Sequence, residues 1–407
     1  MNTKNSDSQF NPEELKKLFS HAYTLQEAGK LEDALLAYDT LLTLIPDSPL
    51  LHFNCGLAWF GLKDFSKAAS HYAKAVTNAP EDPDIHYNRG LNFRRLLRFT
   101  DAAKSFEDAC KAGDTTVDTL YNLALCYQDL EDFPKASRIY ETILSQVPSH
   151  QSSLNNFAYL CHKSGDMKQA EALYSQLLKL NPEHLAAQHM LCSLTGVTPD
   201  TVPLEYVESV FDTYADDFEH SLIENLQYKT PTALYELYCD HFHGVVQTTC
   251  LDLGCGTGLA GEQFKKCCSE LIGMDISQKM LDVAGEKNIY DTLMKDDIIS
   301  FLQTNTQKCD LIVAADVFTY MGDLEAVFKE CCTVIKKSGL LLFSVEEAGN
   351  NSNKKFKLKQ TGRFGHSEKY IKTLCKQTGW TIIDHKLSDL RQEKGEWVRG
   401  HLFILQQ

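Results

Sequence analysis

The feature that most constrains the fold of this chain is a pattern that recurs every 34 residues in its N-terminal half. An alanine marks each of five copies, and an aromatic residue follows it four positions later. The alanines are Ala34, Ala68, Ala102, Ala136 and Ala170, and the aromatic residues are Tyr38, Tyr72, Phe106, Tyr140 and Tyr174. Residues four apart share one face of a helix. Each copy therefore predicts a helix that approaches a neighbour closely at the alanine and fills the same face with a ring.

Proline marks the end of four of the five copies, at Pro46, Pro80, Pro148 and Pro182, and Asp114 stands in the third. Proline cannot continue a helix, so it ends each unit. The period and pattern resemble the tetratricopeptide repeat (TPR), a helix-turn-helix unit of 34 residues. The resemblance implies an all-α superhelical array over residues 12–196, with about five repeats and a capping helix from Leu185 to Thr195.

Four asparagines are also one repeat apart: Asn54, Asn88, Asn122 and Asn156. In the TPR family the first helices line a concave groove, so the resemblance implies that these amides form a ladder there. An amide side chain both donates and accepts hydrogen bonds, which suits the backbone of an extended peptide. We therefore expect a peptide or protein partner in the groove. The alternative is that the asparagines make only local contacts.

A glycine-rich turn begins the C-terminal region, 247–407. TTCLDLGCGTGLAGEQF predicts a buried strand, a turn at Gly254, Gly256 and Gly258, and the start of a helix. A second apolar strand, ELIGMD, ends at Asp275, where an acid is placed to bind ribose hydroxyls. Asp252 precedes the first glycine by two residues, and an acid there suits a ligand with an ammonium group better than a pyrophosphate.

This spacing resembles motif I of the class I methyltransferases that use S-adenosylmethionine and release S-adenosylhomocysteine. The resemblance covers about 200–407 and is closest to a bacterial-looking family in which repeats and methyltransferase are fused. It implies a doubly wound, Rossmann-like sheet whose last strands, TIIDHKL and HLFILQQ, form an antiparallel hairpin. It also implies further cofactor-binding residues: Ile276, Met280, Asp297, Ile298, Asp316 and Phe318.

A helical connector is expected over residues 197–246. Its aromatic residues Tyr206, Phe211 and Tyr214 have spacings that suit one helical face. The stretch resembles the F-D-x-Y-A-x-x-F-D segment that covers the cofactor in many small-molecule methyltransferases, so we expect a lid. The alternative is ordinary packing on the following domain.

Two residues are candidates for catalysis, His366 in GRFGHSEKY and Tyr320 in the loop after the fourth strand. A histidine can titrate near neutral pH and act as a base; the alternative is that His366 caps the following helix. Arg391 either binds an acidic group of the substrate or is a solvated hairpin charge. Cys239, lying near two histidines, lacks a full set of metal ligands, so we expect no metal.

Composition limits the classes of partner and the cell compartment that we expect for this chain. The formal net charge of −15 argues against nucleic acid or an anionic membrane surface as the main partner. The 14 cysteines include no C-x-x-C pair, and no apolar leader or membrane span is visible, so we expect a cytoplasmic protein. Three functions remain open: a methyltransferase whose repeats recruit a protein substrate or partner, a small-metabolite methyltransferase with repeats for assembly only, and a non-enzymatic scaffold that binds the cofactor structurally.

Overall fold

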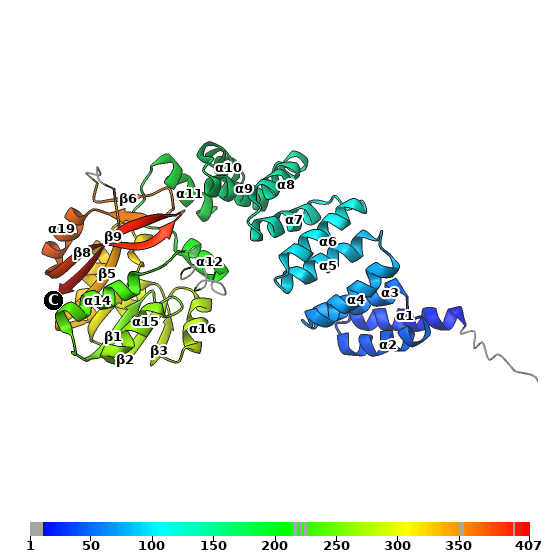
Figure 1. The fold of residues 1–407 in the computed structure, drawn as a ribbon, viewed down its shortest axis with the longest axis horizontal. Coiled ribbons are helices and arrows are strands. Elements are labelled where there is room, and N and C mark those ends of the chain that lie inside the picture. The colour runs from blue at the N-terminus through cyan, green and yellow to red at the C-terminus, as the bar shows by residue number, and fades with distance from the viewer. Residues whose placement is uncertain (1–10, 215–218, 220–221, 223–225, 350–353, 394) are drawn as a thin grey trace, which may run out of the picture. The chain divides into compact units, whose positions relative to one another are not determined.

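The computed structural model describes residues 11–214, 219, 222, 226–349, 354–393 and 395–407. The chain divides into two compact units, Met1–Leu180 and Asn181–Gln407, and each unit is described by itself. Figure 1 shows stacked helices in the first unit and a twisted sheet flanked by helices in the second.

The first unit consists of antiparallel helix pairs, and successive pairs stack on one another. Its described helices are α1 (Pro12–Glu27), α2 (Leu31–Leu44), α3 (Pro49–Gly61), α4 (Phe65–Asn78), α5 (Pro83–Arg95), α6 (Phe99–Lys111), α7 (Val117–Asp129), α8 (Phe133–Gln146), α9 (Gln151–Ser164) and α10 (Met167–Leu180). The five repeat alanines and the five aromatic residues are all buried, which confirms the predicted role of the period. The first helices complement them with glycine: a Cβ on Gly56 would lie 2.6 Å from the ring of Tyr72, so only glycine allows this approach.

The third repeat ends without proline because Asp114 forms the turn in another way. Its carboxylate accepts hydrogen bonds from the amide of Thr116, at 3.0 Å, and from the hydroxyl of Thr119. Side-chain bonds of this kind compete with helix continuation and favour a turn. Thr116 then caps α7 by accepting a bond from the amide of Thr119.

The second unit is built on one mixed sheet of nine strands within its described residues. Five parallel strands run in the order β3-β2-β1-β4-β5; β9 pairs antiparallel with β5 and with β8, and β7 pairs with the end of β5 and with β6. The strands are β1 (Gln247–Leu253), β2 (Cys268–Asp275), β3 (Thr292–Lys295), β4 (Cys309–Ala314), β5 (Ile335–Glu347), β6 (Phe356–Leu358), β7 (Phe364–His366), β8 (Thr381–Glu393) and β9 (Glu396–Gln406). The doubly wound sheet and its antiparallel last hairpin are confirmed. The short β6–β7 hairpin was not predicted.

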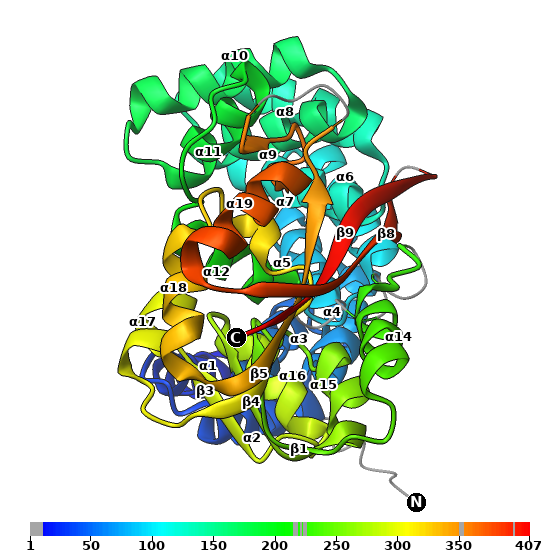
Figure 2. The same cartoon turned by 90° about the vertical axis from the view of Figure 1, so that its left-hand side faces the viewer.

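Helices cover both faces of the sheet, and β1 shows how the sequence achieves this. Leu251 and Leu253 pack in the cluster under α17 (Ile298–Thr304), α18 (Glu325–Val334) and α19 (Glu368–Thr378). Cys250 points to the other face, under α14 (Thr230–Phe242) and α15 (Leu259–Phe264). Figure 2 shows α17–α19 on one side of the sheet and α14 and α15 on the other. Near-continuous apolar strands are typical of parallel sheets buried on both faces.

Helices α11 (Leu185–Thr195) and α12 (Leu204–Tyr214) belong to the second unit. Although α11 was expected to cap the repeats, its His189 shares a 2.7 Å hydrogen bond with the carbonyl of Gly362, and its Cys192 packs against a small cluster with Val202 and Phe364. Among the helices that the structure describes, none has both the length and the apolar composition needed to cross a membrane.

Candidate functional site

The glycine-rich turn lies at the carboxyl end of β1. Gly254, Gly256 and Gly258 all have positive φ, at 61°, 54° and 96°. This left-handed conformation favours glycine, and a Cβ on Gly254 would also lie 2.7 Å from the side chain of Val317. The turn therefore brings bare backbone to the edge of the sheet where ligands bind in open α/β folds.

Asp275 ends β2 beside this turn. Its carboxylate accepts hydrogen bonds from the amide of Gly256, at 2.8 Å, and from the amide of Ser277, at 2.9 Å. The side chain is buried, and burial raises its pKa above the ordinary value. Asp275 thus links the glycine turn to the start of α16 (Gln278–Glu286), and it places a buried carboxylate where the sequence predicted one for a ribose.

Asp252 points away from that carboxylate, toward the face of the sheet covered by α15. The phenol of Tyr290 donates a 2.7 Å hydrogen bond to it, and burial raises the pKa of Asp252 to about 7. The structure therefore uses this acid to hold Tyr290 within the domain. Its predicted contact with a ligand ammonium group stays a prediction.

The remaining residues predicted around the adenine lie along α16 and α17. Met280 is fully buried on α16, while Ile276 is half-buried beside Asp275. Asp297 caps α17, because one carboxylate oxygen accepts bonds from the amides of Ile299 and Ser300 at 3.1 and 3.2 Å. Ile298 packs against the core below. Their contacts with a cofactor stay predictions.

Helix α12 is tied to the start of α16 by polar contacts. The hydroxyl of Ser277 donates a 2.6 Å bond to Asp212, and Lys279 donates a 2.9 Å bond to the carbonyl of the same residue. Phe211 packs edge-on against Tyr320, with ring centroids 5.2 Å apart. Because Ser277 also touches Asp275, α12 lies next to the predicted ribose site.

The three aromatic residues predicted for a lid do not act alike. Phe211 lies against the loop after β4, whereas Tyr206 packs on His189, with ring centroids 5.1 Å apart, and belongs to the cluster near β6 and β7. Tyr214 is the last residue of α12, and its side chain lies outside the described residues. A lid formed by α12 stays a prediction that only Phe211 supports by position.

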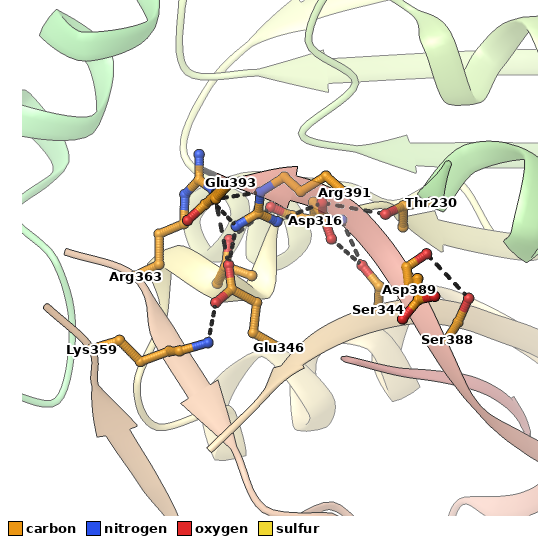
Figure 3. Close-up of polar contacts among 11 residues, drawn as sticks. Thr230, Asp316, Ser344, Glu346, Lys359, Arg363, Ser388, Asp389, Arg391 and Glu393 are labelled. Atoms are coloured by element: carbon orange, nitrogen blue, oxygen red, sulfur yellow. Dashed lines mark hydrogen bonds and ion pairs between the residues drawn. The ribbon is translucent and has the colours of Figure 1, made fainter. Parts of the chain in front are cut away.

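A charge cluster lies at the carboxyl ends of β4 and β5, and Figure 3 shows its contacts. Arg391 of β8 is only 2% exposed and pairs with three carboxylates. The interpretation of Arg391 as a solvated hairpin charge is therefore wrong: β8 runs along the sheet and buries this position. The cluster consists of Asp316, Glu346, Lys359, Arg363, Arg391 and Glu393.

Glu346, at the end of β5, is the most deeply buried carboxylate of the charge cluster, at 1% exposed. One of its oxygens accepts from Arg391 and the other accepts from Lys359 at 2.8 Å. Burial opposes its ionisation, but the charges of Arg391 and Lys359 outweigh that effect and hold the pKa of Glu346 at about 2. A buried acid is stable in its charged form only when paired in this way.

Asp316 has a left-handed backbone, with φ of 59°. Ser344 secures it twice at 2.8 Å, since its hydroxyl accepts from the Asp316 amide and donates to the Asp316 carboxylate. Thr230 donates a third bond at 3.3 Å. A non-glycine residue held in this conformation is often found at a functional site. The predicted contact of Asp316 with a cofactor stays a prediction.

Phe318 and Tyr320 occupy opposite environments in the loop after β4. Phe318 is fully buried between Phe328 and Phe343 in the core, and its expected cofactor contact stays a prediction. Tyr320 is half-buried, and the guanidinium of Arg363 lies over its ring, 5.9 Å from the centroid. Tyr320 thus joins the charge cluster to Phe211.

His366 is not placed to act as a base. It is fully buried in β7, its Nε2 lies 2.9 Å from the carbonyl of Gly322, and burial lowers its pKa to about 4. The helix-capping alternative is also wrong, because Ser367 caps α19. The β6–β7 hairpin, which the sequence did not predict, accounts for both errors by turning the imidazole into the core.

The asparagines of the predicted ladder make contacts within their own helices and, at Asn122 and Asn156, between helices; Asn122 accepts a 2.9 Å hydrogen bond from Arg94. The side-chain amides of Asn54, Asn88 and Asn122 each donate to the carbonyl four residues earlier, at 2.8 to 2.9 Å. Asn156 instead donates to the hydroxyl of Tyr121, at 3.1 Å. Asn54 is buried, whereas Asn88 and Asn122 are half-buried and each keeps a second N–H, so peptide binding stays a prediction.

Sequence reasoning missed several polar residues of the site. Tyr290 and Ser344 gave no signal, because each is defined by a partner distant in the chain. Glu346 did give one: like Asp275, it is an acid at the end of an apolar strand.

The described residues contain no group of three or more ligand side chains arranged to hold a metal ion. His241, one of the two histidines near Cys239, pairs with Asp384 at 2.7 Å.

Comparison with known protein families matches three regions of the chain. Residues 251–343 match a methyltransferase domain, and residues 19–83 and 115–183 match two tetratricopeptide repeat families. The methyltransferase match runs from β1 to β5 and so includes the glycine turn, Asp275, Asp316 and Tyr320. The repeat matches cover helix pairs of the first unit, and the second match extends to residue 183, just beyond the end of that unit.

The curated relatives each match less than half of the chain. Malonyl-[acyl-carrier protein] O-methyltransferase of Yersinia pestis is 26% identical over 163 residues, which is 40% of this chain and 58% of that protein. Ubiquinone biosynthesis O-methyltransferase of Coxiella burnetii is 31% identical over 97 residues, or 23% of this chain and 42% of that protein. The chain therefore spans about half the length of these curated relatives. Among solved structures, magnesium protoporphyrin IX methyltransferase from Synechocystis PCC 6803 with bound S-adenosylhomocysteine aligns with 50% of this chain and all of its own, at 14% identity and a TM-score of 0.40.

Proposed function

This chain carries tetratricopeptide repeats and a class I methyltransferase domain, and from that premise we propose that it transfers a methyl group from S-adenosylmethionine to an acceptor. We further propose that the repeats recruit a peptide or protein, either as substrate or as partner. The two curated relatives described above are named O-methyltransferases, which favours an oxygen atom as the acceptor.

The observation that carries the proposal is the carboxylate of Asp275 beside the glycine turn. Its two backbone hydrogen bonds fix both oxygens at the edge of the sheet, which suits a ribose diol. The acid of Asp212 lies close by, bound to Ser277. Carboxylates around the turn fit a ligand that carries a sulfonium and an ammonium group, and they oppose a pyrophosphate.

S-adenosylmethionine supplies an electrophilic methyl group when bound; the protein supplies position and a dry site. Asp275 would hold the ribose, and the glycine turn would let the ligand approach the backbone amides. Phe211 and Tyr320 pack on each other and would close the space beside Asp275 and the glycine turn. No protonatable side chain is assigned as a base, since His366 faces the core.

Transfer of tritium from S-adenosyl-[methyl-³H]methionine to the components of a cell extract tests this function. Wild-type protein should label an acceptor. Asp275→Asn, which cannot provide a charged acceptor for the ribose, should lose most of the labelling at a low cofactor concentration. Asp282→Asn is the matched control, because Asp282 lies on α16 with an exposed contact to Gln278. Equal labelling by wild type and Asp275→Asn would contradict the proposal.

A further inference from the structure

The charge cluster has an arrangement that recognition of the cofactor does not explain. It brings together Lys359, Arg363 and Arg391, in a chain whose net charge is −15. They lie at the carboxyl ends of β4 and β5, on the edge of the sheet where ligands bind in this type of fold. Buried ion pairs add little to stability compared with apolar packing, so their presence here needs another explanation.

The three carboxylates of the charge cluster differ in how firmly they are held. Glu346 is 1% exposed and bound at both oxygens, and Asp316 is fixed by Ser344 and Thr230. Glu393 is 26% exposed and uses one oxygen, Oε1, for its contacts with Arg363, at 2.7 Å, and with Arg391, at 2.9 Å. It is also the last residue of β8, at the tip of the β8–β9 hairpin. Glu393 is therefore the carboxylate most easily displaced.

The charge balance of the cluster shows that displacement of Glu393 would require another anion in its place. With Glu393 the three cations face three carboxylates and the cluster is neutral. Without Glu393 only the carboxylates of Glu346 and Asp316 remain, and the cluster has a net charge of +1. A partly buried positive charge needs an anion, and a guanidinium binds a carboxylate through paired N–H groups. Arg363 is 26% exposed, so a ligand can reach its fork.

Tyr320 connects this position to the place where an acceptor would sit. The guanidinium of Arg363 lies over the Tyr320 ring, and that ring packs against Phe211 of α12, the helix tied to Ser277 beside Asp275. A group bound to Arg363 would thus lie next to an aromatic surface and close to the predicted cofactor site.

We propose that the methyl acceptor carries a carboxylate that binds Arg363 by displacing Glu393, with its apolar part against Tyr320 and Phe211. The inference rests on the proposed function, which it deepens by naming the chemical class of the acceptor. Glu393 acts as an internal substitute for that carboxylate in the absence of ligand. Lys359, which contacts Glu346 at 2.8 Å, adds positive charge beside the same position.

The probe for this site is phenylacetate, which combines a carboxylate with a ring, and phenylacetamide is its uncharged match. Binding is measured by NMR line broadening of the probe, with and without S-adenosylhomocysteine, whose own binding is measured first by calorimetry. The acid should bind more tightly than the amide. A hydrogen bond to a charged group corresponds to roughly ten- to 150-fold in affinity, so Arg363→Gln should weaken the acid by about that factor and leave the amide unaffected.

A second variant, Glu393→Gln, should increase the affinity for phenylacetate, whereas Arg363→Gln should decrease it. Glu393→Gln removes the competing carboxylate, so the acid should bind more tightly than it does to wild type. Glu396→Gln, on an exposed position of the same hairpin, should have no effect. Arg363→Lys keeps the charge without the fork and replaces Arg363→Gln if the latter does not fold. Equal binding of acid and amide, or unchanged acid affinity in Glu393→Gln, overturns the inference, whereas failure of S-adenosylhomocysteine to bind any variant contradicts the proposed function instead.

Discussion

The phenol of Tyr290 donates a 2.7 Å hydrogen bond to the carboxylate of Asp252, beneath the glycine-rich turn. This pair lies on the face of β1 opposite the core leucines, and it fixes how closely the loop before β3 can approach the turn. Two predictions depend on it, one for the charge of the acid and one for the space around the ring.

The first prediction concerns stability and pH. Burial raises the pKa of Asp252 to about 7 in the folded protein, whereas an unfolded aspartate has a pKa of about 3.9. Between these values the folded state binds more protons, so this group makes stability fall as the pH rises, by up to about 1.4 kcal/mol per pH unit. Asp252→Asn cannot ionise and should lose less stability between pH 5 and 8. Urea unfolding of wild type and Asp252→Asn across that range measures the free energy of unfolding at each pH. The same change with pH in both proteins would refute the prediction.

The second prediction concerns the space filled by Tyr290. A Cβ on Gly261, in α15, would collide with the Tyr290 hydroxyl, whereas a Cβ on Gly285, in α16, would meet nothing closer than 3.7 Å. Gly261→Ala should therefore destabilise the protein by about 1–3 kcal/mol. Gly285→Ala, the matched control, should be neutral or stabilise by up to about 1 kcal/mol, because alanine favours a helix. Thermal unfolding compares the midpoints of the two variants. Equal midpoints would contradict the prediction and show that the Tyr290 ring moves aside.

The third prediction concerns helix α12. If α12 covers the cofactor, its amides, Leu204–Tyr214, should exchange hydrogen more slowly when S-adenosylhomocysteine is added. Asp212→Asn should reduce that protection, because the carboxylate accepts from Ser277 beside Asp275. Helix α18 is the internal control, since its buried residues pack in the core cluster under the sheet. Unchanged exchange in α12 on ligand addition would leave it as ordinary packing.

The fourth prediction concerns the asparagine ladder. Changing Asn88 and Asn122 together to Ala should weaken an extended peptide partner about five- to 150-fold, if each amide contributes about 0.5–1.5 kcal/mol. Asn78→Ala is the matched control, because Asn78 makes the same bond to the carbonyl four residues earlier but lies on a second helix, α4. A pull-down followed by affinities for the captured peptides measures the effect. Equal affinities for all three proteins would make the ladder a local packing feature.

The sequence predicted those parts of the molecule that depend on periodicity or on a contiguous motif. Ala34 and Tyr38 predict their helix because residues four apart share a face, and Asp275 is predicted by the strand that it ends. The charge cluster was not predicted, because Asp316, Glu346 and Arg391 come from three separate strands or their ends and meet only after the sheet has formed.

His366 was also assigned wrongly because its environment depends on strand pairing. Its residue type suits a base, yet three-residue strands such as β6 and β7 have too weak a pattern to be predicted, and their pairing decides that its ring faces the core. Helix α11 was assigned to the repeats for a related reason: its sequence continues the helical pattern, but the bond from His189 to Gly362 joins it to the second unit.

The central claim is that this domain binds S-adenosylmethionine, and calorimetry with S-adenosylmethionine and NAD tests it most directly. We expect S-adenosylmethionine to bind more tightly, and Asp275→Asn to lose about 1.5–3 kcal/mol of that binding energy, because the ribose hydroxyls lose their charged acceptor. Tighter binding of NAD than of S-adenosylmethionine would contradict the account.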